Sequence, residues 1–199
     1  MKKLFCFSLI FIALSFSTNT NEVPFSTEIE SFQLGKVSIK WTAYKHSSKI
    51  PVNGAFEKVE VTNFKGSSDL TSSVTGTKFK IPISSINTND KTRDAKIISA
   101  FFKTMINTSY IYGSINNMND NGSGKITLTM NNKSIEENYS WNMDKNTNEL
   151  YIKTSINVLK WGAQNALNAL NKVCLDRHTG TDGVNKLWPD VDITVIAEL

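Results

Sequence analysis

The stretch FKIPISSINTNDKTRDAKIISAFF, residues 79–102, contains two different periodicities of apolar residues. Phe79, Ile81 and Ile83 alternate with other residues, and this period of two predicts a β-strand with one apolar face. Further along, apolar residues recur at helical spacing behind a capping residue at Asn89 or Asp90. These apolar residues are Ile97, Ile98, Phe101, Phe102 and Met105. The stretch therefore predicts a strand followed by one short helix over residues 90–106.

Strand-like alternation continues on both sides of this stretch. It recurs in eight segments, at residues 37–43, 56–61, 79–83, 110–115, 126–130, 135–143, 152–158 and 191–197. Short polar turns such as Asn53-Gly54 separate the segments, and a second helical stripe of apolar residues runs from Gly162 to Val173. We expect an all-β fold, an eight-stranded antiparallel β-barrel whose closure removes the sheet edges. One short helix follows the third or fourth strand, and a second lies near the C-terminus.

The N-terminus has the layout of a secretory signal peptide. Lys2 and Lys3 precede an apolar run from Leu4 to Phe16, and small residues follow it. This run is shorter than the roughly 20 residues of a membrane-spanning helix, so a retained membrane anchor is disfavoured. We expect cleavage near Ser17 or Asn19, a signal peptide over residues 1–19, one domain over residues 20–199, and a periplasmic or secreted protein.

Charge and cysteine content narrow the function classes. The chain has 22 basic and 18 acidic residues, a net charge of +4, which falls to +2 without Lys2 and Lys3. The remaining basic residues are scattered rather than gathered in a stripe, which argues against nucleic acid as a partner. Cys174 is the one cysteine left after cleavage, so we expect no internal disulfide and a buried thiol.

The central stretch resembles the YceI-like family. The motifs that carry the resemblance are the turn Ser85-Ile86-x-Thr88, the pair Arg93-Asp94, the doublet Phe101-Phe102, the segment Val52-x-Gly54-x-Phe56, the strand beginning at Gly124 and the closing strand from Pro189. The resemblance covers nearly all of the chain after the signal peptide. It implies a lipocalin-like eight-stranded barrel that holds a polyisoprenoid or similar lipid, and an exported location.

The inward-facing residues of this expected barrel are candidate ligand-binding residues. They are Trp41, Phe56, Phe79, Ile81, Ile83, Phe101, Phe102, Ile126, Leu128, Trp141, Ile152, Ile156, Leu170 and Trp188. An eight-stranded barrel has room either for packed side chains or for one slender ligand. Alternation does not separate these two cases; the residues alone favour a filled core, and the family resemblance favours a hollow one.

Two further segments have predicted structural roles. Arg93 and Asp94 lie at the start of the expected helix, where Asp94 complements the helix dipole and Arg93 can reach carbonyl groups of the turn from Ser85 to Thr88. We interpret this pair as a structural brace. The helix from Gly162 to Val173 either forms a lid over one end of the barrel or covers an apolar patch, and the sequence leaves both open.

An enzyme is disfavoured because no catalytic or metal-binding motif is recognisable. Cys174-x-Asp176-x-His178 places three reactive residue types together, but His46 is the only other histidine in the chain. We interpret this segment as a capping loop and expect no cofactor and no metal, beyond a bound isoprenoid or fatty lipid. A lipid carrier is the leading hypothesis; a filled barrel that binds another protein is the alternative, and homodimerisation is left open.

Overall fold

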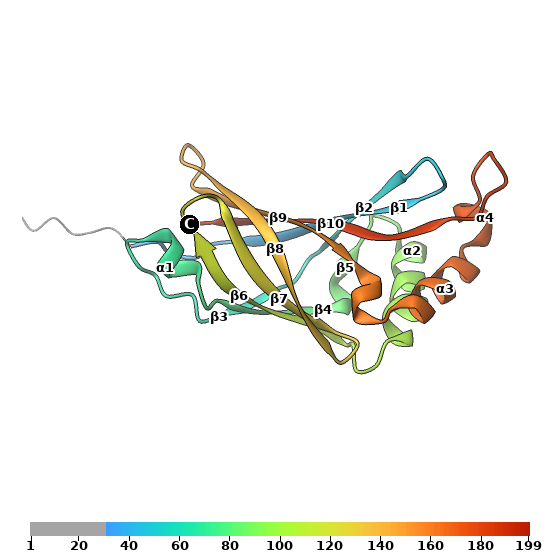
Figure 1. Ribbon diagram of the computed structural model, residues 1–199, viewed down its shortest axis with the longest axis horizontal. Coiled ribbons are helices and arrows are strands. Elements are labelled where there is room, and N and C mark those ends of the chain that lie inside the picture. The colour runs from blue at the N-terminus through green and yellow to red at the C-terminus, as the bar shows by residue number, and fades with distance from the viewer. Residues whose placement is uncertain (1–30) are drawn as a thin grey trace, which may run out of the picture.

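The computed structural model describes residues 31–199 as one antiparallel sheet with short helices at its two ends (Figure 1). The strands are β1 (Val37–Lys45), β2 (Ile50–Phe56), β3 (Glu60–Thr62), β4 (Lys78–Pro82), β5 (Ile86–Asn87), β6 (Tyr110–Asn119), β7 (Ser123–Met130), β8 (Lys133–Asp144), β9 (Glu149–Asn157) and β10 (Leu187–Glu198). The α-helices are α1 (Leu70–Val74), α2 (Lys91–Lys96), α3 (Gln164–Val173) and α4 (Leu175–His178). The predicted all-β fold is confirmed. The predicted signal peptide lies outside the described residues.

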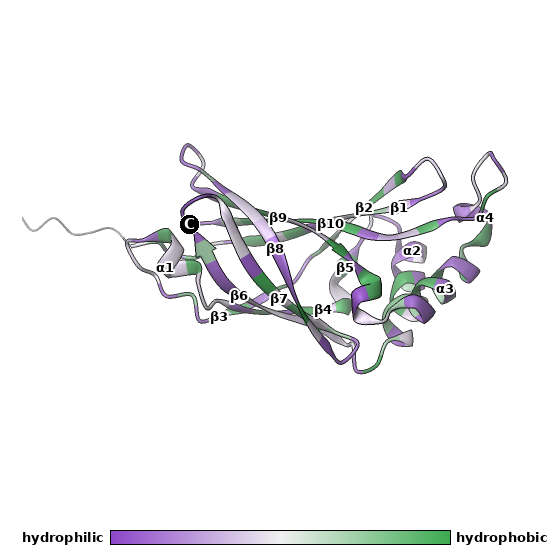
Figure 2. Cartoon of the chain, viewed as in Figure 1, coloured by the Kyte–Doolittle hydropathy of each residue, from purple (hydrophilic) through white to green (hydrophobic). Residues whose placement is uncertain are grey.

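The strands form a single curled sheet. Their order is β3-β4-β6-β7-β8-β9-β10-β1-β2-β5, and every neighbouring pair is antiparallel. Most neighbours in the sheet are also neighbours in sequence, as expected for a meander joined by short polar turns. Apolar side chains alternate along the strands, so curling the sheet places its apolar face inside (Figure 2).

The predicted strand count is wrong, because the sheet has ten strands rather than eight. The difference arises in two stretches of chain that are each interrupted: residues 50–62, of which 56–61 were predicted as one strand, and residues 78–87, of which 79–83 were predicted. The first bends at residues 57–59, between β2 and β3, and the second turns through a 3-10 helix (Ile83–Ser85) between β4 and β5. β2 pairs with β5 and β3 pairs with β4, so the two interrupted segments run beside each other. β3, at one end of the strand order, thus follows β2, which lies near the other end. In the same way β5 follows β4, so the two ends of the sheet are connected through these two stretches of chain.

The predicted first helix begins where expected. The Asp90 side chain accepts a hydrogen bond from the Arg93 backbone N–H at 3.0 Å, which caps α2. The helical path continues through a π-helical turn (Ile97–Phe101) and a 3-10 turn (Phe102–Thr104). The second predicted helix is α3, and the segment after it, interpreted as a loop, contains α4. Helix α1 was not predicted.

Helices cover the two ends of the curled sheet (Figure 1). Helices α2 and α3 lie at one end with α4 beside them, and α1 lies at the opposite end. Trp161, just before α3, is fully buried at 0 % exposure and donates its ring N–H to the Leu128 carbonyl at 3.0 Å. Within residues 31–199, no helix combines the length and the apolar character needed to cross a membrane.

Candidate functional site

The curled sheet encloses a cavity of about 240 Å³. Its wall is built by nine strands, all except β8, together with α1, the helical turns after α2, and α3. Thr77 and Thr154 are the only residues of the wall that are neither aliphatic nor aromatic, and no wall residue is charged. Because placing an unpaired polar or ionic group on such a wall is unfavourable, the cavity suits an apolar guest.

Three glycines explain why the barrel is hollow although large aromatic residues point inward. Each glycine lies directly opposite an aromatic residue on the neighbouring strand: Gly54 opposite Trp41, Gly113 opposite Phe79, and Gly124 opposite Tyr139. A Cβ atom built on any of these glycines would lie 2.0–2.2 Å from the partner ring. Each ring therefore lies over the bare backbone of the next strand instead of filling the interior.

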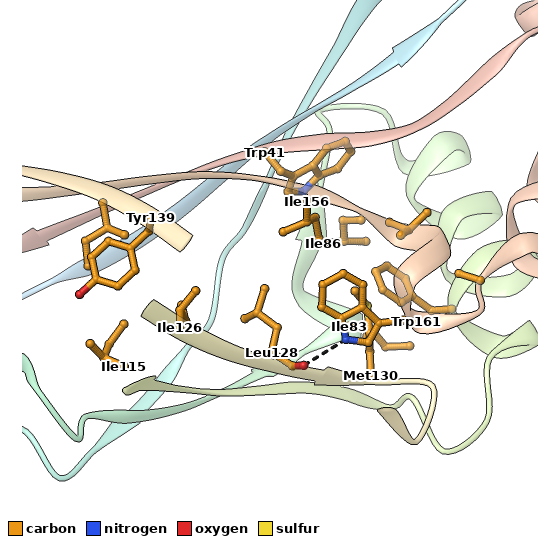
Figure 3. Close-up of a cluster of buried hydrophobic side chains, with 14 of the residues drawn as sticks. Trp41, Ile83, Ile86, Ile115, Ile126, Leu128, Met130, Tyr139, Ile156 and Trp161 are labelled. Atoms are coloured by element: carbon orange, nitrogen blue, oxygen red, sulfur yellow. Dashed lines mark hydrogen bonds between the residues drawn. The ribbon is translucent and has the colours of Figure 1, made fainter. Parts of the chain in front are cut away.

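Most of the predicted ligand-binding residues meet on the cavity wall. Twelve of the fourteen line it: Trp41, Phe56, Phe79, Ile81, Phe101, Phe102, Ile126, Leu128, Ile152, Ile156, Leu170 and Trp188. Figure 3 shows how Trp41 and Ile156 approach from one side of the interior and Ile126 and Leu128 from the other. The period of two therefore identified which face of each strand turns inward.

The other two predicted residues do not line the cavity. Ile83 is buried in the 3-10 helix between β4 and β5, outside the regular alternation. Trp141 donates its ring N–H to the Asn119 carbonyl at 3.0 Å, which holds it beside the end of β6. Both lie at places where a local feature, a helical turn or a hairpin end, overrides the strand pattern.

The wall near α1 was missed by the sequence analysis. Leu34, Phe64, Val74 and Leu199 contribute to the cavity there, and all four lie outside the β-strands. The missed signal was Asp69, whose side chain accepts a hydrogen bond from the Ser72 N–H at 2.7 Å and caps α1. A five-residue helix carries too little periodicity to be recognised from its apolar residues.

Two polar atoms on the cavity wall have no hydrogen-bond partner among the described residues. They are Nε1 of Trp41 and Oγ1 of Thr77, both buried. A buried donor without an acceptor costs about 1–3 kcal/mol. A guest that placed an oxygen atom beside either group would remove that cost, so these atoms are the polar groups of the wall that remain available for recognition.

Asp94, rather than Arg93, makes the contact that holds the start of α2 against the turn before it. One carboxylate oxygen of this buried residue accepts hydrogen bonds from the backbone N–H and the hydroxyl of Thr88 at 2.8 and 2.7 Å. The expected contact of Arg93 with the turn from Ser85 to Thr88 is not found in the described structure. Instead, the Arg93 guanidinium lies 3.5 Å from Asp90. Asp94 thus connects α2 to the strand end before it.

The segment from Cys174 to His178, interpreted as a capping loop, contains α4. Cys174 is buried as expected, and His178 is also buried, whereas the three residues between them are exposed. His178 ends α4, and its Nδ1 lies 2.8 Å from the Asn171 side-chain oxygen. Burial lowers the pKa of His178 to about 4, helped by the nearby positive charges of Lys45, His46 and Lys96. Within residues 31–199, no three His, Cys, Asp or Glu residues are grouped so that they could hold a metal ion.

Solved structures with the same fold come from several bacteria. BcnA of Burkholderia cenocepacia has a TM-score of 0.55 at 13% identity, covering 83% of this chain and 98% of BcnA. A polyisoprenoid binding domain from Saccharophagus degradans, implicated in plant cell wall breakdown, has a TM-score of 0.57 at 11% identity, covering 84% of this chain and 95% of that one. At these identities, the likeness establishes the fold alone.

Sequence comparison identifies the family. No curated protein matches the chain. The model of the YceI-like domain matches residues 15–199, which include every strand and helix described above. The central motif, the curled antiparallel sheet and the enclosed apolar cavity agree with this match. The chain belongs to the YceI-like domain family.

Proposed function

We propose that this protein is an exported binding protein that carries one long apolar or amphiphilic lipid, of polyisoprenoid type, inside its curled sheet. The observation that carries the proposal is the continuous apolar cavity with two threonines as its only polar side chains other than ring N–H groups. The name of the Saccharophagus degradans domain, polyisoprenoid binding, supports the choice of lipid class.

The shape of the cavity favours a chain-like guest over a compact one. Its wall extends from Leu34 and Leu199 near α1 to Leu170 and Trp188 near the other helical end. A wall that runs from one end of the curled sheet to the other suits an extended hydrocarbon or isoprenoid chain.

The hollow interior argues against the alternative of a filled barrel that acts only through its outer surface. Natural cores are packed closely, and voids larger than a water molecule are few. In this chain Gly54 and Gly113, opposite the wall residues Trp41 and Phe79, keep space open that ordinary residues would fill. We infer that an interior kept open in this way is used for binding, and we assign no catalytic step to it.

The test is extraction of purified protein with organic solvent followed by mass spectrometry, applied to the wild type and to Gly54→Val. The wild type is expected to release lipid in near-stoichiometric amount. In Gly54→Val, the new side chain occupies the position of the Trp41 ring, so the ring must move into the cavity and displace the lipid. The matched control is Ala55→Val, which adds bulk to the same strand on its opposite face.

The outcomes separate binding from folding. Loss of lipid from a cooperatively melting Gly54→Val protein, with lipid retained by Ala55→Val, supports the proposal. Gly113→Ala, which acts on Phe79 in another strand, gives a second variant if Gly54→Val does not fold. Wild-type protein that is free of lipid and does not take up an added isoprenoid would overturn it.

A further inference from the structure

The cavity ends at Trp188, and two lysines stack on this side chain. Trp188 lies at the start of β10 and is part of the cavity wall. The Nζ atoms of Lys49 and Lys186 lie 4.4 and 4.3 Å from the centre of its ring. The ring is fixed by its own N–H, which donates to the His46 carbonyl at 2.7 Å. Two ammonium groups are therefore held beside the end of an apolar channel.

These two ammonium groups are not neutralised by acidic partners. Among the described residues, neither Lys49 nor Lys186 lies within 4.0 Å of a carboxylate, although other basic side chains form six such pairs. Acidic residues in the neighbouring segments have partners of their own: Asp182 accepts from the Val184 N–H at 3.0 Å, Asp190 from the Asn157 side chain at 2.9 Å, and Asp192 from the Tyr44 hydroxyl. The positive charge at this end is therefore available to a ligand.

Further basic groups surround the same end of the molecule. The Lys45 Nζ donates to the Arg177 carbonyl at 3.0 Å, and His46 Nε2 lies 3.0 Å from the same oxygen. These contacts join the β1–β2 hairpin to α4, and the two lie at the same end of the molecule in Figure 1. The pKa of His178 is lowered mainly by burial and in part by these basic groups, because Lys45, His46 and Lys96 disfavour a further positive charge beside them.

We propose that Lys49 and Lys186 form a binding site for the anionic headgroup, a phosphate or carboxylate, of the lipid whose chain occupies the cavity. This inference rests on the proposed function and adds the class of ligand, an anionic amphiphile rather than a neutral one. The chain would pass Trp188, and the headgroup would meet two ammonium groups that are close to the surface yet held in place by the ring. Lysine binds phosphate through charge and hydrogen bonds, so a compact anion suits this pair.

The experiment compares two lipids that differ only in the headgroup. Geranylgeranyl phosphate, geranylgeraniol and inorganic phosphate are titrated by calorimetry into delipidated protein at low and high salt. The wild type is expected to bind the phosphate lipid about tenfold or more tightly than the alcohol, with the difference shrinking at high salt. The double variant Lys49→Gln/Lys186→Gln is expected to bind the two lipids equally, with its affinity for the alcohol unchanged.

A matched control removes the same charge elsewhere. Lys80 also stacks on an aromatic ring, at 4.1 Å from the Tyr110 ring centre, but it lies in β4 and pairs with Glu60. Lys153 is an exposed residue of β9 that does not line the cavity. The double variant Lys80→Gln/Lys153→Gln is therefore expected to keep the preference for the phosphate lipid. Equal binding of both lipids by the wild type would overturn the headgroup site but not the proposed function. Inorganic phosphate that bound as tightly as geranylgeranyl phosphate would also overturn the headgroup site alone. If neither geranylgeranyl phosphate nor geranylgeraniol bound, the proposed function would be overturned and this inference with it.

Discussion

The two ends of the curled sheet are closed in different ways. The α1 end is closed by one short piece of chain: Ser73 is fully buried, and its hydroxyl hydrogen-bonds to the Ser67 and Asp69 carbonyls at 3.0 and 2.9 Å. The opposite, helical end combines two segments that are far apart in sequence, the helical turns after α2 and the helix α3. Trp161 is also fully buried there and hydrogen-bonds to the Leu128 carbonyl in β7.

We call the segment around α1, residues 65–77, the α1 plug, and α2 with the helical turns after it, together with α3 and α4, the helical cap. The α1 plug is built from one continuous segment, joined to β6 by hydrogen bonds of Gly76 and Thr77 with Ile115 at 2.8 and 2.9 Å, and we expect it to open more easily than the rest of the sheet. The helical cap depends on packing between distant segments, and the lysines beside Trp188 lie at the same end, in the β1–β2 turn and just before β10. We therefore expect substitutions at the helical end to weaken the whole fold and substitutions at the α1 end to have smaller, local effects.

The largest expected effect is that of Trp161→Ala. Removing this fully buried side chain leaves a large cavity and removes the ring hydrogen bond to the Leu128 carbonyl, so the free energy of unfolding should fall by about 3–5 kcal/mol. Val74→Ala at the α1 end removes only two buried methyl groups and should cost about 1–2 kcal/mol. Urea unfolding of both variants measures the difference. Equal losses in the two variants would contradict the distinction between the plug and the cap.

The sequence predicted the long strands well because their signal is local. Alternation along β7 or β10 needs only the residues of one strand, and eight of the twelve predicted residues that line the cavity were identified by this rule. The interruptions after β2 and β4 were not predictable, since each depends on the pairing of two segments with one another. Gly54, Gly113 and Gly124 were visible as glycines within strands, but their role needed the cross-strand partners.

A smaller effect is expected from Asp94→Ala in the helical cap. The substitution leaves the Thr88 N–H and hydroxyl without their shared acceptor in a buried position, which should lower the free energy of unfolding by about 2–3 kcal/mol. Arg93→Ala is the matched neighbour. It removes a partly exposed contact with Asp90 and should cost less than about 1 kcal/mol. Thermal and urea unfolding measure which substitution lowers the free energy of unfolding more. If Arg93→Ala were as unstable as Asp94→Ala, Arg93 rather than Asp94 would be the residue that holds α2 in place.

The smallest expected effect is a pH dependence that originates in the helical cap. Burial lowers the pKa of His178 to about 4 from an ordinary value of 6.5, so the folded protein favours the neutral ring. Below the ordinary value, the unfolded chain binds a proton that the folded chain does not. The contribution of His178 to stability is therefore complete above pH 6.5 and is lost as the pH falls toward 4. Between about pH 7 and about pH 5.5, this loss amounts to about 1 kcal/mol.

His178→Gln isolates this contribution, because glutamine keeps a polar group near Asn171 but does not titrate. The variant is expected to be less stable than the wild type at neutral pH and to lose less stability on acidification, so the two unfolding curves converge at low pH. Hydrogen exchange locates the effect: on acidification of the wild type, amides of α3 and α4 should lose protection while those around α1 keep theirs. If both ends lost protection together, the plug and the cap would open as one cooperative unit. If the variant and the wild type followed the same pH dependence, the acid sensitivity would belong to other groups.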